Sequence, residues 1–139
     1  MRILIVEDAD ERIKWFKDFF GVEHILDVTK DANEAIAWLE EGRTYAGIFL
    51  DHDLSDAHYA LLSQERTEFD EFTGHAVACW LAGNPQNYRG IPIVIHSLNA
   101  YGRLRMQRVL VAAGYSVSVV PFTILCLPGV LKLDQKETS

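Results

Sequence analysis

The sequence predicts an α/β fold, a three-layer sandwich in which helices cover both faces of a five-stranded parallel sheet. Short apolar runs, typical of buried strands, alternate along the chain with segments whose apolar residues recur every three or four positions, as in helices. Strands separated by helices are joined by right-handed crossovers, which makes the sheet parallel. The length of 139 residues fits a single domain, 1–139, with one core.

The five predicted strands share a short apolar run bounded by turn-forming or charged residues. The first run is almost continuously apolar, which is typical of a strand buried on both faces. In chain order the predicted strands are 2–6, 24–29, 45–50, 92–95 and 116–120.

The first two predicted helices have both an apolar stripe and a boundary signal. A helix from Asp10 places Ile13, Phe16 and Phe20 on one face and ends at Gly21. A second helix begins at an N-cap, Asp31, and ends near residue 42.

Two more helices follow the third and fourth strands. Thr73 and Gly74 open a helix that Pro85 and the two residues before it end. The next helix carries its apolar residues over 106–113 and ends at Gly114.

Two segments have no firm period. Residues 54–72 hold five acidic residues and predict a long insertion loop, with a short helix around 59–65 left open. Pro128 and Gly129 interrupt the last segment, so 123–139 is predicted to be short or irregular.

Polar residues follow three of the strands. The three groups are Glu7-Asp8, Asp51-His52-Asp53 and His96-Ser97-Leu98-Asn99. Open α/β sheets bind their ligands beyond the carboxyl ends of the strands, where the strand order reverses. The coincidence of three groups at this edge is the strongest functional signal in the sequence.

The acidic groups predict a metal site. Neighbouring strands lie about 4.8 Å apart, so the carboxylates after the first and third strands converge and repel one another. A divalent cation relieves that repulsion, and hard oxygen ligands suit Mg²⁺ or Mn²⁺. The predicted ligands are Glu7, Asp8, Asp51 and Asp53, although Glu7 and Asp8 taken alone are equally compatible with solvated acids after a strand.

The histidines predict acid–base chemistry, with a packing role as the alternative. His52 and His96 end adjacent strands, and imidazoles exchange protons near neutral pH. Each is also compatible with a ring packed under a helix, or with a nitrogen ligand that favours Mn²⁺ or Zn²⁺.

Four further residues are predicted to contact a phosphate. Thr73 and His75 lie at a helix N-terminus, where free amides suit an anion, unless Thr73 only caps the helix. Ser97 and Asn99 are short donors sized for phosphate oxygens, or ordinary turn residues.

These residues resemble the response-regulator receiver family over nearly the whole chain. Glu7-Asp8 looks like the acidic pair that holds Mg²⁺ in receivers, Asp51 occupies the phosphoacceptor position, and Ser97 the switch position. The resemblance implies a flavodoxin-like sheet with strand order 2-1-3-4-5. Val120 is a departure, because receivers have a lysine there.

The chain more closely resembles a smaller family with this fold, the cyclic-phosphate-processing receiver-like family. The shared features are the Asp-His-Asp run, the Thr-Gly helix start and the His-Ser-x-Asn run. The resemblance implies a metal-assisted phosphoesterase that acts on cyclic phosphates or nucleotide phosphodiesters, with Asp51, His52 and His96 as catalytic residues. The alternatives are a stand-alone receiver phosphorylated at Asp51 and a pseudo-receiver that binds without chemistry.

The bulk properties narrow the partners. A net charge of −7 with no Lys/Arg cluster argues against duplex nucleic acid, but admits a small phosphorylated ligand or nucleotide. The chain has no apolar run of 18 residues, so no membrane span is predicted. Its start lacks the features of a signal peptide, and a cytoplasmic protein is therefore expected. Cys79 and Cys126 are predicted to be reduced core residues. A homodimer is left open.

Overall fold

The computed structural model describes residues 1–54 and 73–130, and within them a parallel sheet of five strands has the order β2-β1-β3-β4-β5. This order confirms the predicted fold class. The strands are β1 (Arg2–Val6), β2 (Ile25–Thr29), β3 (Gly47–Leu50), β4 (Ile93–Ile95) and β5 (Val117–Val119).

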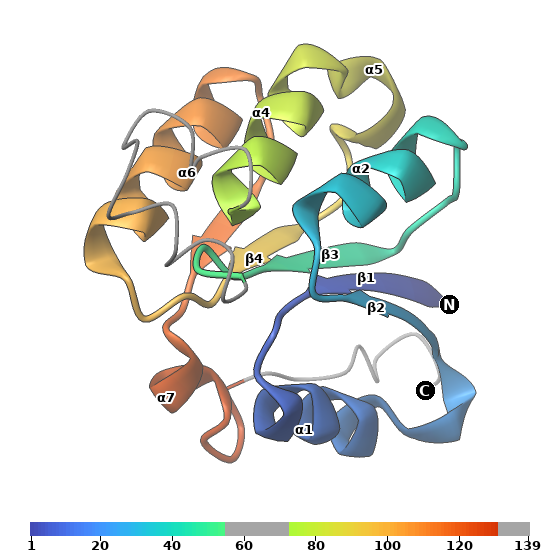
Figure 1. Cartoon of the computed structure of the whole chain (residues 1–139), viewed down its shortest axis with the longest axis vertical. Helices are drawn as coiled ribbons and strands as arrows, with labels where there is room; N and C mark the ends of the chain where they lie inside the picture. The colour runs from blue at the N-terminus through green and yellow to red at the C-terminus, as the bar shows by residue number, and fades with distance from the viewer. Residues whose placement is uncertain (55–72, 131–139) are drawn as a thin grey trace.

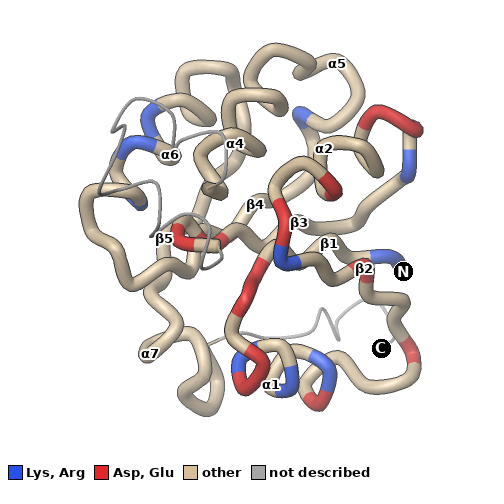
Figure 2. The backbone as a smooth tube through the Cα atoms, viewed as in Figure 1, with Lys and Arg blue, Asp and Glu red and all other residues tan. Residues whose placement is uncertain are grey.

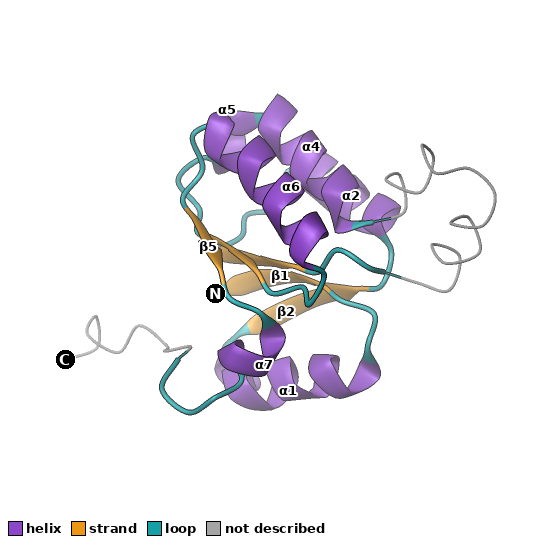
Figure 3. Cartoon of the chain, turned by 90° about the vertical axis from the view of Figure 1, so that its left-hand side faces the viewer, coloured by secondary structure: helices purple, strands orange, loops and turns teal. Residues whose placement is uncertain are grey.

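Helices cover both faces of the sheet (Figures 1 and 3). One layer holds α2, α4, α5 and α6, and the other holds α1 and α7. Their bounds are α1 (Asp10–Phe20), followed by a 3₁₀ turn at Gly21–Glu23, then α2 (Ala32–Glu40), α4 (Gly74–Gly83), α5 (Pro85–Tyr88), α6 (Ala100–Ala112) and α7 (Phe122–Leu125). The short helix α5 was not predicted, because Pro85 was interpreted only as a stop, although proline also favours the first turn of a helix.

Alternation along β1 divides the core between the two layers. Leu4 and Val6 pack under the layer of α2, α4 and α6, whereas Ile3 and Ile5 pack with Phe16 of α1. The central strands are therefore buried on both faces. Burial on both faces fixes the positions of the strand ends that carry the polar groups.

The prediction that both cysteines are core residues is wrong. Cys79 is exposed and Cys126 is half-buried, and among the described residues neither forms a disulfide bond. Ala78 and Leu81 face the core from α4, which turns Cys79 outward.

Some predictions fall outside the described residues. They include nearly all of the 54–72 loop with its short helix, and the last nine residues of the 123–139 segment. Together with the single-domain assignment, they stay predictions. Among the described residues, no helix is both long and apolar enough to cross a membrane.

Candidate functional site

The register of the sheet brings the three polar groups to one edge. Val6 is level with Leu50, and Leu50 is level with Ile95, so β1, β3 and β4 end together. Backbone hydrogen bonds extend the pairing by one residue, from the Asp51 amide to the Val6 carbonyl and from the His96 amide to the Leu50 carbonyl, each at 3.0 Å. Acidic segments follow β1 and β3 at this edge (Figure 2).

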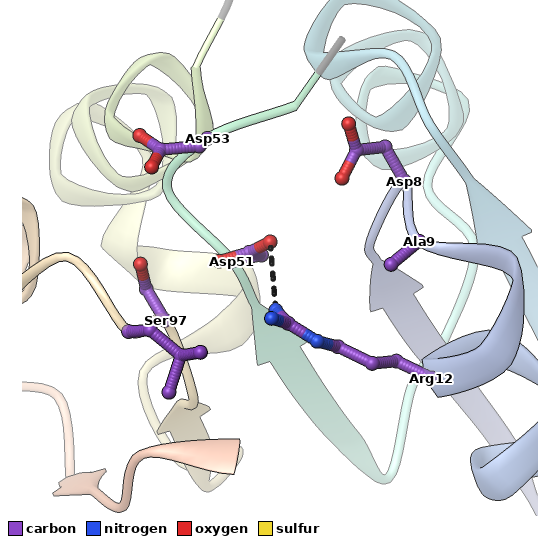
Figure 4. A pocket seen from close by; sticks show the side chains of 7 residues that line it. Asp8, Ala9, Arg12, Asp51, Asp53 and Ser97 are labelled. Carbon is purple, nitrogen blue, oxygen red and sulfur yellow. Dashed lines mark ion pairs between the residues drawn. The ribbon is translucent and has the colours of Figure 1, made fainter. Parts of the chain in front are cut away.

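A pocket of about 130 Å³ opens at this edge (Figure 4). Carboxylates of Asp8 and Asp53 lie on opposite sides of it, with Asp51 between them and Arg12 reaching in from α1. The volume is well below the several hundred Å³ of a typical small-molecule site. It therefore suits a hydrated cation or one phosphoryl group rather than a whole nucleotide. The described lining residues are Asp8, Ala9, Arg12, Asp51, Asp53, Ser97 and Leu98.

Carboxyl groups dominate the pocket, and when they are ionised their negative charges exceed the single positive charge of Arg12. Burial and the nearby charge of Glu7 raise the pKa of Asp51 to about 8, although Ser97 donates a hydrogen bond to Asp51 and Arg12 lies close by. Burial and the charge of Glu7 also raise the pKa of Asp8. Arg12 is the only basic residue among the described lining residues, so it balances just part of this charge. The oxygen donors and their uncompensated charge fit a divalent cation.

Glu7 lies behind the pocket and is fully buried. Its Oε2 accepts hydrogen bonds from the amides of Asp8 at 3.0 Å and Ala9 at 2.9 Å. Its Oε1 lies 2.8 Å from Nε2 of His96, which is also fully buried. Burial raises the pKa of Glu7, but the hydrogen bonds from His96 and the Ala9 amide, together with the charge of Arg12, leave that pKa below its ordinary value.

Burial lowers the pKa of His96, so the neutral ring donates its Nε2 proton to the Glu7 carboxylate. Among the described residues Nδ1 of His96 has no hydrogen-bond partner, and the ring packs against Phe16, Phe49 and Phe122. Donor atoms of Glu7, Asp51 and His96 lie within 4.8 Å of one another. Among the described residues, the carboxylates of Asp8, Asp51 and Asp53 do not all lie that close together. A cation among Glu7, Asp51 and His96 would have to break the bond between Glu7 and His96, whereas a cation in the open pocket would require the three aspartates to draw closer together.

His52 is buried beneath α6 and does not line the pocket. A Cβ atom at Gly102 would overlap the His52 ring, so this close approach requires glycine. Nδ1 of His52 lies 2.7 Å from Oδ1 of Asp53, and Nδ2 of Asn99 donates to the same oxygen at 3.2 Å. Asn99 also caps α6 by accepting from the Gly102 amide at 2.9 Å. His52 and Asn99 therefore hold Asp53 in place.

Thr73 and His75 lie at the start of α4, behind the 51–53 backbone. Oγ1 of Thr73 accepts from the His75 amide at 3.1 Å, which is the capping role left open from the sequence. The Gly74 amide donates to the His52 carbonyl at 2.9 Å, and a Cβ atom at Gly74 would overlap the Asp51 carbonyl. The predicted phosphate contact of Thr73 and His75 stays a prediction. Ser97 is the predicted phosphate contact that lines the pocket.

Arg12 is the charged pocket residue that the sequence analysis missed. Its Nη1 lies 3.7 Å from Oδ2 of Asp51 and 3.7 Å from Oε1 of Glu7, and its guanidinium lies over the Phe122 ring, 5.3 Å from the centroid. One signal was available. Arg12 lies in the first turn of α1, where the helix dipole disfavours a cation, next to two acids that suit that position.

Solved receiver domains share this fold. A CheY-like receiver domain of Methylobacillus flagellatus has a TM-score of 0.59 at 16% identity, with 99% of this chain and 96% of that one covered. The response regulator TrrA of Thermotoga maritima, solved with Mg²⁺ and BeF, has 0.56 at 14%, covering 99% and 91%. The receiver domain of a Pseudomonas aeruginosa sensor histidine kinase, with magnesium in its active site cleft, has 0.57 at 17%, covering 86% and 83%. At these identities the likeness establishes the CheY-like receiver fold alone.

The family follows from the sequence. The model of the family described as "Cyclic-phosphate processing Receiver domain" matches residues 2–112, which is most of the chain. The chain belongs to this family, and the match confirms the predicted resemblance. Among curated proteins none matches significantly.

Proposed function

We propose that this chain is a metal-dependent phosphoesterase that acts on a cyclic phosphate or a nucleotide phosphodiester. One observation carries the proposal: three carboxylates, an arginine and a serine surround a pocket the size of a phosphoryl group. The description of the family, which names cyclic-phosphate processing, supports the substrate class. The magnesium in two similar receiver structures supports the cation.

Asp8, Asp51 and Asp53 would hold the cation, and to do so their carboxylates would have to draw closer together than they lie in the structure. All three present carboxylate oxygens, and among the described lining residues no histidine nitrogen faces the pocket, so Mg²⁺ or Mn²⁺ is favoured over Zn²⁺. When bound, such a cation neutralises phosphate charge and makes a bound water more acidic. Glu7, predicted as a fourth ligand, would instead anchor the site from behind through its bond to His96.

In this proposal Asp53 is a metal ligand that its hydrogen bonds hold in position. Its side chain is 30% exposed, and His52 and Asn99 fix one of its oxygens. In this proposal His52 and His96 position Asp53 and Glu7, and their direct acid–base roles stay predictions. The Ser97 hydroxyl would turn from Asp51 to donate to a phosphate oxygen, with the sugar or base left outside the small pocket.

The test is turnover of 2′,3′-cyclic nucleotides by the purified chain with Mg²⁺ or Mn²⁺. We expect hydrolysis that a chelator stops and that Asp51→Asn and Asp53→Asn each reduce by at least about a hundredfold, since both remove a metal ligand. Asp18→Asn is the matched control, because it removes an exposed carboxylate on α1 that does not line the pocket. Wild-type turnover no higher than that of Asp51→Asn would contradict the proposal.

A second candidate is a stand-alone receiver that is phosphorylated at Asp51. The observation that favours it is the position of Asp51, directly after β3 with the Arg12 guanidinium 3.7 Å from its carboxylate. Incubation with acetyl phosphate and Mg²⁺, followed by intact mass measurement, tests this candidate. A labile gain of one phosphoryl group, absent in Asp51→Asn, would support it, and no gain would exclude it.

A further inference from the structure

Arg12 has unused donor capacity. Both of its carboxylate neighbours lie at 3.7 Å, beyond the 2.7–2.9 Å of a charge-assisted hydrogen bond. Among the described residues no hydrogen bond of its guanidinium is found, although only 23% of the side chain is exposed. A guanidinium has five N–H donors in a planar fork that matches the oxygens of carboxylate and phosphate. A mostly buried arginine with free donors is therefore prepared for an anion.

The protein holds this arginine by stacking rather than by ion pairs. The guanidinium lies over the Phe122 ring, and the Phe122 amide donates to the His96 carbonyl at 2.9 Å. This bond ties the aromatic platform to the end of β4, next to Ser97. A cation–π contact holds the plane of the guanidinium without consuming its N–H groups. Figure 4 shows the guanidinium pointing into the pocket toward Asp51.

Val120 leaves the β5 side of this edge without a charge. It is partly buried and packs in the cluster that contains Phe122. No basic side chain other than that of Arg12 lines the pocket among the described residues. Arg12, on the α1 side, is therefore the basic side chain that can contact an anion entering the pocket with a metal ion.

We propose that Arg12 is the phosphoryl-binding residue of this pocket, a fork that α1 presents and Phe122 holds opposite the carboxylates. The inference rests on the proposed function, because it assumes that a phosphoryl group binds there with a cation. The proposal gives the Arg12 side chain opposite effects on the binding of the phosphoryl group and of the metal ion. Arg12 attracts the phosphoryl group, and its positive charge opposes metal binding at Asp51.

The experiment measures two affinities separately, for Mg²⁺ alone and for orthovanadate, a phosphate mimic, in saturating Mg²⁺. In Arg12→Gln we expect vanadate to bind about tenfold more weakly or worse, the effect of losing charge-assisted hydrogen bonds. Mg²⁺ should bind as tightly as in wild type or more tightly. Arg12→Lys keeps the charge but loses the fork and should be intermediate. Arg108→Gln, on α6 outside the pocket, is the matched control.

The outcomes separate the inference from the proposed function. If wild type binds no Mg²⁺, the proposed function fails. If Mg²⁺ binds normally and vanadate binds equally to wild type and Arg12→Gln, only the inference fails. Equal losses of Mg²⁺ and vanadate affinity in Arg12→Gln would show a structural role and would also overturn the inference.

Discussion

Two aspartates on neighbouring regions of the same sheet have opposite surroundings. Asp27 of β2 receives hydrogen bonds from Arg2 at 2.8 Å, from Arg43 at 2.9 Å and from the Tyr45 hydroxyl at 2.8 Å. Asp51, after β3, has the Arg12 guanidinium at 3.7 Å and faces other carboxylates. Asp27 has its cations within hydrogen-bond distance, and Asp51 does not.

The pKa shifts follow the same division. Burial raises the pKa of Asp27, but the bonds from Tyr45 and Arg43 and the charge of Arg2 outweigh burial and leave the pKa below its ordinary value. The pKa of Asp51 is raised to about 8. Folding alone compensates the charge of Asp27, whereas at Asp51 burial and the charge of Glu7 outweigh the hydrogen bonds from the His52 amide and Ser97. A buried carboxylate in a cleft that the protein leaves uncompensated is a good indicator of a functional site.

The largest effect is expected behind the pocket, at His96. In His96→Leu the Glu7 carboxylate stays buried without its partner, which should lower the free energy of unfolding by about 3 kcal/mol. The double variant Glu7→Gln/His96→Leu removes the unpaired charge and should recover most of the loss. Urea denaturation of both measures this. If His96→Leu alone leaves the free energy of unfolding almost unchanged, the Glu7–His96 pair does not stabilise the fold and the account is contradicted.

A second prediction concerns Asp51 itself. Asp51→Asn should weaken Mg²⁺ binding by about a hundredfold, because it removes a metal ligand. Without metal, the same variant should be more stable than wild type at pH 8, because the repulsion between Asp51 and Glu7 is gone. Thermal unfolding with and without Mg²⁺ measures both effects. If Asp51→Asn without metal is less stable than metal-free wild type, the Asp51 carboxylate stabilises the fold as Asp27 does, and the difference between the two aspartates is contradicted.

Asp27→Asn should do the reverse and destabilise the metal-free chain. Loss of its buried bonds to Tyr45 and the two arginines should cost about 2 kcal/mol at pH 7. Because the folded-state pKa of Asp27 is lowered, its stabilisation is fully present above the unfolded-state pKa of about 3.9. It is lost as the pH falls through the lower folded-state pKa. A difference between wild type and variant that persists unchanged to pH 2 would contradict this account.

The smallest effect is expected at the exposed Lys14–Asp18 pair of α1. The two side chains lie one turn apart at 2.8 Å and are 76% and 66% exposed. Surface pairs of this kind contribute little. Asp18→Asn should leave both the unfolding midpoint and Mg²⁺ affinity at wild-type values. A clear shift in either would mean that net charge, rather than local surroundings, governs the differences above.

The sequence predicted the fold, the edge of the sheet that carries the site, and four residues that line the pocket, namely Asp8, Asp51, Asp53 and Ser97. It did not predict that His52 is covered or that Arg12 enters the pocket. Apolar runs define the strands, and parallel pairing then brings their polar ends together, so the convergence at Asp51 follows from local pattern. The position of His52 depends on Gly102, fifty residues away, which lets α6 come close enough to cover the ring. That of Arg12 depends on the rotation of α1 and on Phe122. Such contacts between distant segments have no local signature.

The most direct test of the account is the anomalous density of a crystal grown with Mn²⁺. The account predicts one ordered ion in the pocket, with carboxylate oxygens of Asp8, Asp51 and Asp53 about 2.1–2.2 Å away, close to the distance expected for Mg²⁺, and with the Glu7–His96 bond intact. An ion seated between Glu7 and His96, or a pocket without manganese at saturating concentration, would contradict it.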